Sequence, residues 1–554
     1  MDSFSDSAVV THNDALIEHV PRTSASGGGL DAVIGRALKS LLSEQFPDGY
    51  WCYEFEADCT IPAEFILMMH FMDDVDEALE SKIAVYLRSR QGEDGGWPLY
   101  YGGAMEISCS VKTYYALKIA GDDPEAPHMT RAREAILARG GAVNANVFTH
   151  ITLALFGQIP WRGVPFIPVE VMLFPKWFPF HLSKVSYWSR TVMVPLFVLC
   201  TLKPRAANPR NVHVRELFVT PPEVERNYFP VRSGLNRMFL WLDRAGRSLE
   251  PLIPAFVRKR AIRKAERFVI ERLNGEDGLG AIFPAMVNAH EMFALLGYPP
   301  EHPYRKLTRR ALNKLLVIKD DFAYCQPCLS PVWDTGLACL AIQEASERGD
   351  TGEVVRALDW LKPLQLLTEP GDWQWQRPNL RGGGWAFEFR NDPYPDIDDT
   401  PVVAWSMLQT GRPEYGEAIA RAAEWICGMQ SGNGGYASFD ADNMHYYLNE
   451  IPFADHGALL DPPTSDVTAR CVTFLSKLDR ERFRPTIDRA ITFLKSEQEE
   501  DGPWFGRWGT NYVYGTWSVL TALEAAGEAP EQPWIRLASA WLKRVQRDDG
   551  GWGE

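Results

Sequence analysis

The segment Gln91-Gly92-Glu93-Asp94-Gly95-Gly96-Trp97 follows an apolar stretch, and its order of glutamine, glycine and aromatic residue returns along the chain. The other copies also follow apolar stretches and end in Gly49-Tyr50-Trp51, Gly383-Gly384-Trp385, Gly434-Gly435-Tyr436, Gly502-Pro503-Trp504 and Gly550-Gly551-Trp552. Six copies with one internal order indicate a repeat protein rather than a chance similarity.

Each copy predicts a helix, a glycine turn, a short aromatic segment and a second helix. The glycines permit a positive φ in the turn. The glutamine amide can satisfy backbone groups that are free where the next helix begins. Because such units bury their apolar faces only against one another, the repeat predicts an all-α fold of closed or stacked α/α layers.

A second motif places three carboxylates in front of an apolar helix: Tyr394-Pro395-Asp396-Ile397-Asp398-Asp399-Thr400-Pro401. We expect Thr400 to cap this helix and Pro401 to take its first position. Carboxylates this close raise one another's pKa in a site shielded from water, so the cluster is expected to hold a proton at neutral pH. Taken alone, the pattern also fits an acidic helix cap that points into water.

Length and composition narrow the class of protein. The 554 residues exceed a single core, which predicts two large domains. A net charge of −15 argues against nucleic acid as a partner. Nine cysteines are scattered, and Cys325-x-x-Cys328 has neither a second pair nor a histidine to complete a zinc site. Reduced thiols and the absence of a signal sequence predict a cytoplasmic location.

The remaining regions break the repeat. Residues 1–29 are polar, end in Gly27-Gly28-Gly29 and predict a mobile arm. The apolar segments Met238–Leu242 and Pro251–Val257 run into Arg258-Lys259-Arg260. An apolar helix edged by basic residues fits a helix in a membrane interface, and a packed helix with a solvated end fits equally well. No run of 18 apolar residues is present.

Together these motifs resemble the squalene–hopene cyclase family, the class II triterpene cyclases, from about residue 30 to the last residue. The resemblance rests on the Gln–Trp repeats and on the motif Asp396-x-Asp398-Asp399-Thr400. It also rests on the blocks Phe439-Asp440-Ala441-Asp442-Asn443, Ser330-Pro331-Val332-Trp333-Asp334-Thr335-Gly336 and Trp504-Phe505-Gly506-Arg507-Trp508-Gly509.

The resemblance implies two α/α barrels, residues 30–315 with the membrane-facing segment and residues 316–554 with the acid motif. It implies proton-initiated cyclisation of squalene to hopene, with hopanol formed when water captures the final cation. It further implies a monotopic protein on the cytoplasmic face of the cell membrane. Squalene, a membrane surface and a second copy of the chain are the expected partners, without nucleic acid, metal or cofactor.

By position, the family's site residues can be carried over one at a time. Asp398 is the expected proton donor, with Asp396 and Asp399 beside it and with Asp461 and Asp466 in supporting acidic positions. The aromatic residues expected to face the cation are Trp188, Trp333, Phe387, Phe439 and Trp508. Aromatic faces stabilise a cation by about 0.5–2 kcal/mol each, which suits a reaction that moves positive charge through a cavity.

Three departures from the family bear on these expectations. Arg470 stands where some members have a histidine, and we expect this permanent cation to hold one aspartate ionised while another keeps the proton. Glu64 matches the carboxylate near the terminating water, but Phe283 and Lys112 replace its partners, which affects the ratio of hopene to hopanol. The chain stops at Glu554 inside a repeat, which predicts a C-terminally incomplete barrel.

Four other functions can be compared with this one. Asp73-Asp74-Val75-Asp76-Glu77 superficially offers the diphosphate site of a magnesium-dependent terpene synthase, although an exposed helix start explains it more simply. An α/α-barrel glycosidase also uses paired carboxylates, but it needs a polar cleft. The others are a class II cyclase acting on a different polyene and a non-catalytic lipid-binding toroid descended from a cyclase.

Overall fold

The computed structural model describes residues 29–346 and 349–553. The chain divides into two compact units, residues 1–45 and residues 46–554. In the first unit, the described part consists of helix α1 (Leu30–Ser43), none of whose side chains is buried. The predicted mobile arm, residues 1–29, lies outside the described residues except for Gly29.

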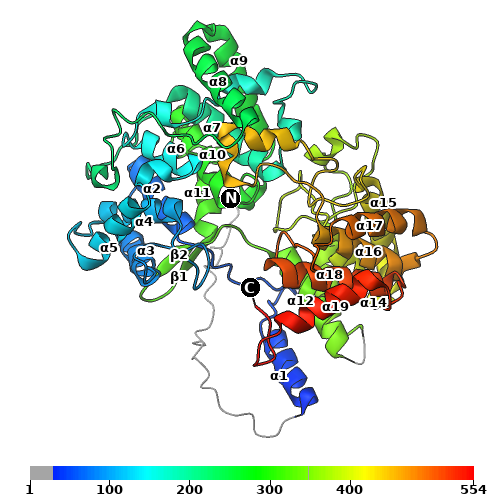
Figure 1. Ribbon diagram of the computed structural model, residues 1–554. Coiled ribbons are helices and arrows are strands. Elements are labelled where there is room, and N and C mark those ends of the chain that lie inside the picture. Colours follow the sequence, from blue (N-terminus) through cyan, green and yellow to red (C-terminus); the bar gives the residue numbers. More distant parts are fainter. Residues whose placement is uncertain (1–28, 347–348, 554) are drawn as a thin grey trace, which may run out of the picture. The chain divides into compact units, whose positions relative to one another are not determined.

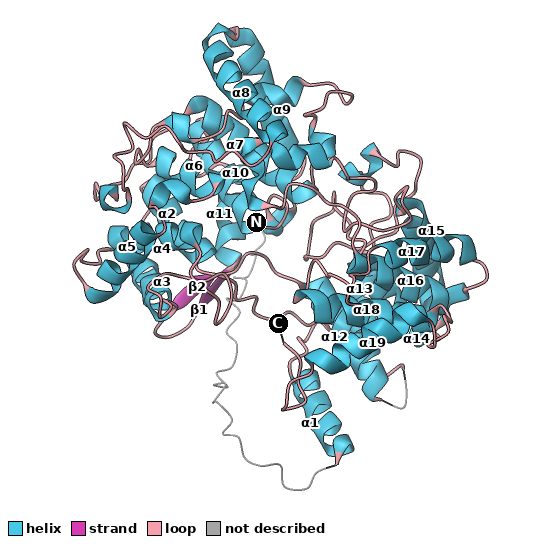
Figure 2. Cartoon of the chain, in the orientation of Figure 1, coloured by secondary structure: helices cyan, strands magenta, loops and turns pink. Residues whose placement is uncertain are grey.

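The second unit is built almost entirely of helices (Figures 1 and 2). The helices before residue 315 are α2 (Thr60–Met72), α3 (Glu77–Ser89), α4 (Ile107–Ala120), α5 (Pro127–Ala138), α6 (Val147–Leu155), α7 (Tyr187–Leu202), α8 (Gly234–Leu249), α9 (Ala255–Ile270), α10 (Phe283–Leu295) and α11 (Pro303–Lys314). A short antiparallel hairpin follows, β1 (Leu316–Ile318) and β2 (Ala323–Cys325). The later helices are α12 (Pro331–Ala345), α13 (Gly352–Leu361), α14 (Asp399–Gln409), α15 (Gly416–Met429), α16 (Ser465–Asp479), α17 (Arg484–Ser496), α18 (Asn511–Ala525) and α19 (Pro533–Val545).

The helices after residue 330 form two layers. Helices α12, α14, α16 and α18 pack side by side in that order, and α13, α15, α17 and α19 each pack on the outside of a neighbour. The layer of a helix determines how many of its side chains are buried. The inner helix α16 is buried on nearly every side, whereas the outer helix α17 buries one apolar stripe. An inner helix surrounded by protein needs apolar residues all round, and an outer helix needs only one such face.

The helices before residue 315 repeat the arrangement. Helices α2, α4 and α6 pack in order, α2 also packs on α10, and α10 packs on α7. Helices α3, α5, α9 and α11 lie on the outer side of these. Both halves are thus built of α/α hairpins in an inner and an outer layer, which is consistent with the α/α toroid fold class predicted from the repeat.

The repeated glutamine joins neighbouring outer helices. The Gln91 amide donates one hydrogen bond to the carbonyl oxygen of Gly95 at 2.7 Å and another to that of His128 at 2.8 Å. His128 lies in the first turn of α5. Gln430 and Gln498 make the same pair of bonds, each to its own turn and to the first turn of the next outer helix. The side chain thus ties each turn to the following hairpin.

The repeated tryptophan closes the end of the helix that precedes it. The Trp97 indole N–H donates to the carbonyl oxygen of Leu87 at 2.7 Å, and Trp504 donates to Leu494 at the same distance. The last carbonyls of a helix have no partner within the helix. Burying an indole there therefore fills the core and also satisfies one of these carbonyls.

The first glycine of a repeat is required by both its backbone conformation and its surroundings. Gly434 has φ +93°, and a Cβ atom there would lie 2.4 Å from the carbonyl oxygen of Arg489 on α17. A side chain at this position would be strained and would push the two hairpins apart. This close approach explains why the turn carries glycine.

The first repeat of the second unit packs on the later half of the chain. The backbone N–H of Trp51 donates to Thr335 Oγ1 at 2.9 Å, and that of Tyr53 donates to Asp334 Oδ2 at 2.9 Å. Both acceptors lie on α12. The Tyr50 ring also lies 4.9 Å from the ring of Trp360 on α13. Residues 46–53 are therefore part of the packing around α12 and α13.

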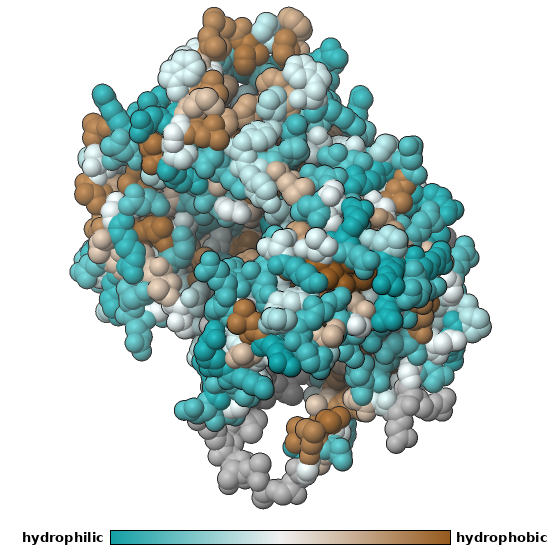
Figure 3. Space-filling model, turned by 45° about the vertical axis from the view of Figure 1, so that its right-hand side comes forward, coloured by the Kyte–Doolittle hydropathy of each residue, from teal (hydrophilic) through white to brown (hydrophobic). Residues whose placement is uncertain are grey.

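Helices α8 and α9 and the short turn between them (Glu250–Leu252) carry large apolar side chains that are exposed. Trp241 is 65%, Leu252 75% and Phe256 74% exposed. Hydrophobic surface gathers at the end of the molecule where these helices lie (Figure 3). Among the described residues, no helix has both the length and the apolar character needed to span a bilayer.

Candidate active site

The acid motif is fixed by backbone bonds before α14 begins. The backbone N–H of Asp396 donates to the carbonyl oxygen of Trp385 at 2.7 Å, and that of Ile397 donates to Ser438 at 2.7 Å. The helix starts at Asp399 with Asp398 as its N-cap, so it begins earlier than predicted. Thr400 lies inside the first turn, where its hydroxyl accepts from Trp385 N–H at 3.1 Å instead of capping the helix.

The three aspartates have different partners. Both oxygens of Asp398 are bonded by Arg470 of α16, through Nε to Oδ1 and through Nη2 to Oδ2, the latter at 2.6 Å. Asp396 accepts the backbone N–H of Asp398 at 2.5 Å. No donor among the described residues bonds either oxygen of Asp399. Arg470 therefore pairs with the predicted proton donor itself, and not with Asp396 or Asp399.

These partners separate the acidities of the three groups. Burial, followed by the charge of Asp398, raises the pKa of Asp396 well above its usual value. Burial and the charges of Asp396 and Asp398 do the same to the pKa of Asp399. Burial also raises the pKa of Asp398, but the Arg470 guanidinium opposes that rise. Asp398 is consequently the strongest acid of the cluster.

Asp461 and Asp466 position the loops around the acid. The Asp461 carboxylate accepts the backbone N–H groups of Ser438, Phe439 and Asp440 at 2.8–3.1 Å. The Asp466 carboxylate accepts those of Arg507 and Trp508 at 2.9 and 3.1 Å. Asp466 also lies 4.0 Å from Arg470. The two carboxylates hold the backbone that carries the aromatic residues Phe439 and Trp508.

The structure brings three of the predicted aromatic residues together. The ring of Trp188 lies 5.9 Å from Phe439 and 5.6 Å from Trp508, both edge to face. The ring of Trp333 lies 5.2 Å from the Arg470 guanidinium carbon. Phe387 is half-buried beside α12, where its carbonyl oxygen accepts from Val332 N–H at 3.4 Å.

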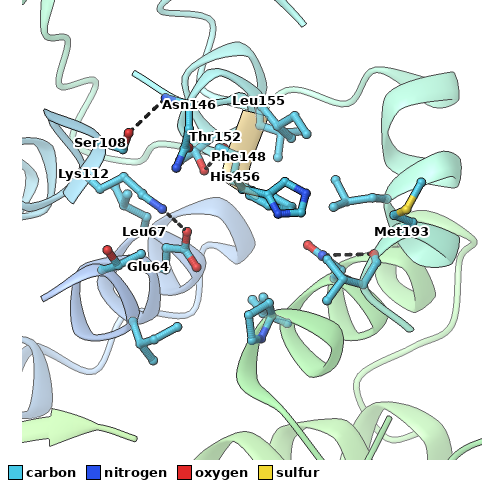
Figure 4. Close-up of a pocket in the computed structure, with 18 of the residues that line it drawn as sticks. Glu64, Leu67, Ser108, Lys112, Asn146, Phe148, Thr152, Leu155, Met193 and His456 are labelled. Carbon is cyan, nitrogen blue, oxygen red and sulfur yellow. Dashed lines mark hydrogen bonds and ion pairs between the residues drawn. The ribbon is translucent and has the colours of Figure 1, made fainter. Parts of the chain in front are cut away.

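A cavity of about 570 Å³ extends from Trp188 into the earlier half of the chain. Most of its lining is apolar. Glu64 of α2 and Lys112 of α4 face one another in it, with Lys112 Nζ 2.7 Å from Glu64 Oε1 (Figure 4). Phe283, which replaces the other expected partner of Glu64, is buried in the core beside Phe65.

The acidic segment at residues 73–77, which could be taken for a diphosphate site, has a structural role. Asp76 is the N-cap of α3 and accepts the backbone N–H groups of Ala78 and Leu79 at 3.1 and 3.0 Å. Asp73 ends α2 with φ +55°. Across residues 29–346 and 349–553, no group of three or more His, Cys, Asp or Glu side chains is arranged to hold a metal ion.

Most of the chain is similar to proteins of known family. Residues 34–321 match the squalene-hopene cyclase N-terminal domain, and residues 329–554 match the squalene-hopene cyclase C-terminal domain. The squalene–hopene cyclase of Zymomonas mobilis is 52% identical over 541 residues, covering 95% of this chain and 82% of the relative. The chain belongs to the squalene–hopene cyclase family.

Further relatives support the same assignment. The squalene–hopene cyclase of Bradyrhizobium diazoefficiens is 51% identical, covering 95% of this chain and 81% of the relative. That of Schizosaccharomyces japonicus is 52% identical, covering 91% of this chain and 78% of the relative. The family resemblance drawn from the motifs is therefore confirmed, whereas the roles of individual residues and the domain boundaries stay predictions.

Several residues of this squalene–hopene cyclase family site were missed in the sequence. Tyr187 lies 4.1 Å from the Phe439 ring and 4.5 Å from that of Tyr394. Tyr514 lies with its ring 5.2 Å from the Arg470 guanidinium carbon. Glu388 is buried near the acid cluster, where burial raises its pKa to about 8. Tyr187 directly precedes the predicted residue Trp188, and Tyr394 opens the quoted acid motif, but no spacing marks Tyr514 or Glu388.

Proposed function

We propose that this protein cyclises squalene to hopene, beginning with proton transfer from Asp398 to a terminal double bond. The alkene electron pair forms the new C–H bond, and the resulting cation is attacked in turn by the next double bonds. The observation that carries this proposal is the buried Asp398–Arg470 pair, which lies beside aromatic rings that lead into an apolar cavity.

The electrostatics of the cluster suit this step. An isolated alkene is an extremely weak base, so it needs a strong acid in a site that excludes water. The raised pKa values of Asp396 and Asp399 favour their protonated forms, which would limit the negative charge around Asp398. A proton on Asp398 lies beside the Arg470 cation and is released more readily than one on either neighbour. Asp396 and Asp398 each keep 5% exposure, whereas Asp399 is fully enclosed.

The aromatic residues continue the mechanism beyond the acid. Trp188, which lines the cavity, packs edge to face with Phe439 and with Trp508. A ring face stabilises a nearby cation by about 0.5–2 kcal/mol, with the larger values in desolvated sites. We expect these rings and those of Trp333 and Phe387 to lower the energy of the cationic intermediates.

Incubation with squalene tests the proposed function. Detergent-solubilised protein is expected to form hopene, detected by gas chromatography with mass spectrometry, with hopanol as the second product. Squalene bound but returned unchanged would support the non-catalytic lipid-binding alternative. Faster conversion of a shorter linear polyene than of squalene would support the alternative of another class II cyclase.

We also propose that α8 and α9 dock on a membrane. Trp241, Leu252 and Phe256 are exposed, and Phe256 lines a groove of about 600 Å³ together with the cations Arg260, Arg263, Lys264 and Arg267. Apolar side chains edged by cations suit an interface with anionic lipid, where each cation contributes about 1 kcal/mol. In a chain of net charge −15, this cluster is a local exception.

Vesicle sedimentation tests the docking surface. We predicted that Phe239 belongs to it, but Phe239 is buried, with its ring 5.9 Å from Phe180. The informative variant therefore changes Trp241, Leu252 and Phe256 to serine, and it should lose most of its binding to anionic vesicles. Replacing the exposed Trp517 of α18 with serine is the control. Unchanged partitioning of the triple variant would move the docking surface elsewhere.

Location and assembly are further proposals. The nine cysteines are all free thiols, which suits the cytoplasmic face of the cell membrane. Cell fractionation should recover the protein with membranes, in a form that detergent releases. The homodimer expected from the family resemblance stays a prediction, which light scattering in detergent can test.

A further inference from the structure

The apolar cavity ends in a polar group made by three helices. Glu64 comes from α2, Lys112 from α4 and Glu291 from α10, and all three line the cavity. Figure 4 shows the Lys112 side chain directed at Glu64 across the space between their helices. We call these three residues the polar end of the cavity. Ionisable side chains are costly in an apolar site, so their presence calls for a role.

The carboxyl group of Glu291 has no polar partner among the described residues. It is 7% exposed, and none of the described residues forms a hydrogen bond or an ion pair with its carboxyl group. Lys112, a cation that lines the same cavity, is paired with Glu64 at 2.7 Å. Burial, followed by the charge of Glu64, raises the pKa of Glu291 to about 8. Burial therefore favours the uncharged carboxylic acid, and its hydrogen-bonding capacity is unused by the described residues.

The polar end lines the same cavity as Trp188, and contacts connect Trp188 to the acid motif. Trp188 lines the cavity and contacts Phe439, whose neighbour Ser438 is bonded to Ile397 in the acid motif. Contacts thus lead from Asp398 through the aromatic rings into the cavity and on to Glu64. In a proton-initiated cyclisation each new cation forms farther from the acid, so the last one is expected in this cavity rather than beside Asp398.

We propose that the carboxyl of Glu291 and the Glu64–Lys112 ion pair together hold the water molecule that captures the last cation. This inference rests on the cyclase function proposed above. The water donates one hydrogen to the Glu64 carboxylate and the other to the carbonyl oxygen of Glu291. Its oxygen lone pair then points into the cavity. Glu291 is a positioning residue in this scheme, and it determines how much alcohol accompanies the alkene.

Two balanced steps can end the reaction at this site. In the first, the water oxygen forms a C–O bond with the cationic carbon, and one water proton passes to Glu64, which gives the alcohol. In the second, a methyl C–H bond beside the cation breaks, its electron pair forms the C=C bond, and the proton passes to Glu64. The second step needs no water, so losing the water removes alcohol and spares alkene.

Two substitutions at Glu291 separate its possible roles. Glu291→Gln keeps an uncharged carbonyl acceptor, and it should leave the alcohol-to-alkene ratio within about twofold of the unmodified protein. Glu291→Leu removes the acceptor at similar volume. It should lower the alcohol share about fivefold to tenfold, the effect of one lost hydrogen bond in a site shielded from bulk water. Met292→Leu, a buried change on the same helix, should leave the ratio unchanged.

The measurement is the ratio of the two products by gas chromatography, with ¹⁸O-labelled water to show where the alcohol oxygen comes from. An unchanged ratio in Glu291→Leu would overturn the inference. A fall in Glu291→Gln as large as that in Glu291→Leu would also overturn it, because Glu291 would then act as an anion. If the leucine variant fails to fold, Glu291→Met makes the same comparison. Total cyclic product reports the proposed function separately, since its absence in the unmodified protein would refute that function and not the role of Glu291 alone.

Discussion

Replacing Asp398 with asparagine tests the proposed proton donor with little change in shape. The amide keeps the size of the side chain and can still accept from Arg470, but it cannot deliver a proton of useful acidity. General acid catalysis contributes about 10²–10⁴ in rate, and an unactivated alkene depends on it more heavily than most substrates. We therefore expect hopene formation to fall by at least about 10³.

The stability cost can be worked from the contacts. Arg470 loses a partner that bonds it through two nitrogen atoms, and Asp466 remains 4.0 Å away. Breaking a buried ion pair costs about 3–5 kcal/mol. Part of this is offset because Asp396 and Asp399 no longer face a third carboxylate. The variant should therefore unfold at a lower temperature while remaining folded under assay conditions.

Asp440→Asn is the matched control. It weakens another buried ion pair, since Arg190 bonds both Asp440 oxygens at 3.0 and 3.1 Å and keeps Asp372 at 3.2 Å. Its stability should fall by a comparable amount, whereas its rate should stay within about tenfold. Product formation is measured by gas chromatography and unfolding by circular dichroism. An Asp398→Asn variant that kept more than about a tenth of the normal rate would remove Asp398 from the role.

Three other predictions follow from the site and the fold. Activity should fall as pH rises through the pKa of Asp398. Arg470→Gln removes the charge that opposes the rise of this pKa, so the fall in activity should move to higher pH. A move to lower pH would contradict the assignment of Asp398 as the acid. Cyclisation should continue in EDTA, and a loss restored by magnesium would show that a metal is needed. Gly434→Ala should lower the free energy of unfolding by about 2 kcal/mol or more, because its Cβ atom would meet a backbone oxygen. Gly416→Ala, at the start of α15, should leave the stability nearly unchanged. Equal melting temperatures for the two variants would refute this explanation of the turn.

The sequence predicted those features that depend on local order. The glutamine, glycine and tryptophan of each repeat fix a turn between two helices, and their spacing is visible without a structure. The acid motif is likewise a short segment, so its place before α14 could be predicted to within two residues. Neighbouring repeats then pack in order, so the layered fold followed from the repeat alone.

Features that depend on distant residues could not be predicted in this way. Arg470 lies 72 positions from Asp398, and no spacing shows which aspartate it bonds. Phe239 looked exposed in an amphipathic helix, but it packs on Phe180 from another segment. In the sequence, Glu291 is one polar residue in an apolar helix. Its proposed role depends on Glu64 and Lys112, which come from two other helices and line the same cavity.

The bonds between residues 46–53 and α12 limit how the molecule can be dissected. The backbone of Trp51 and Tyr53 forms hydrogen bonds with the side chains of Thr335 and Asp334. A fragment that begins near residue 329 therefore lacks residues that pack against α12. Such a fragment should be poorly soluble when expressed alone, and a synthetic peptide spanning residues 46–56 should rescue it in trans. Two segments that lie about 280 positions apart in the sequence thus pack as one unit, and a split version of the protein should assemble only when the cut leaves residues 46–53 available.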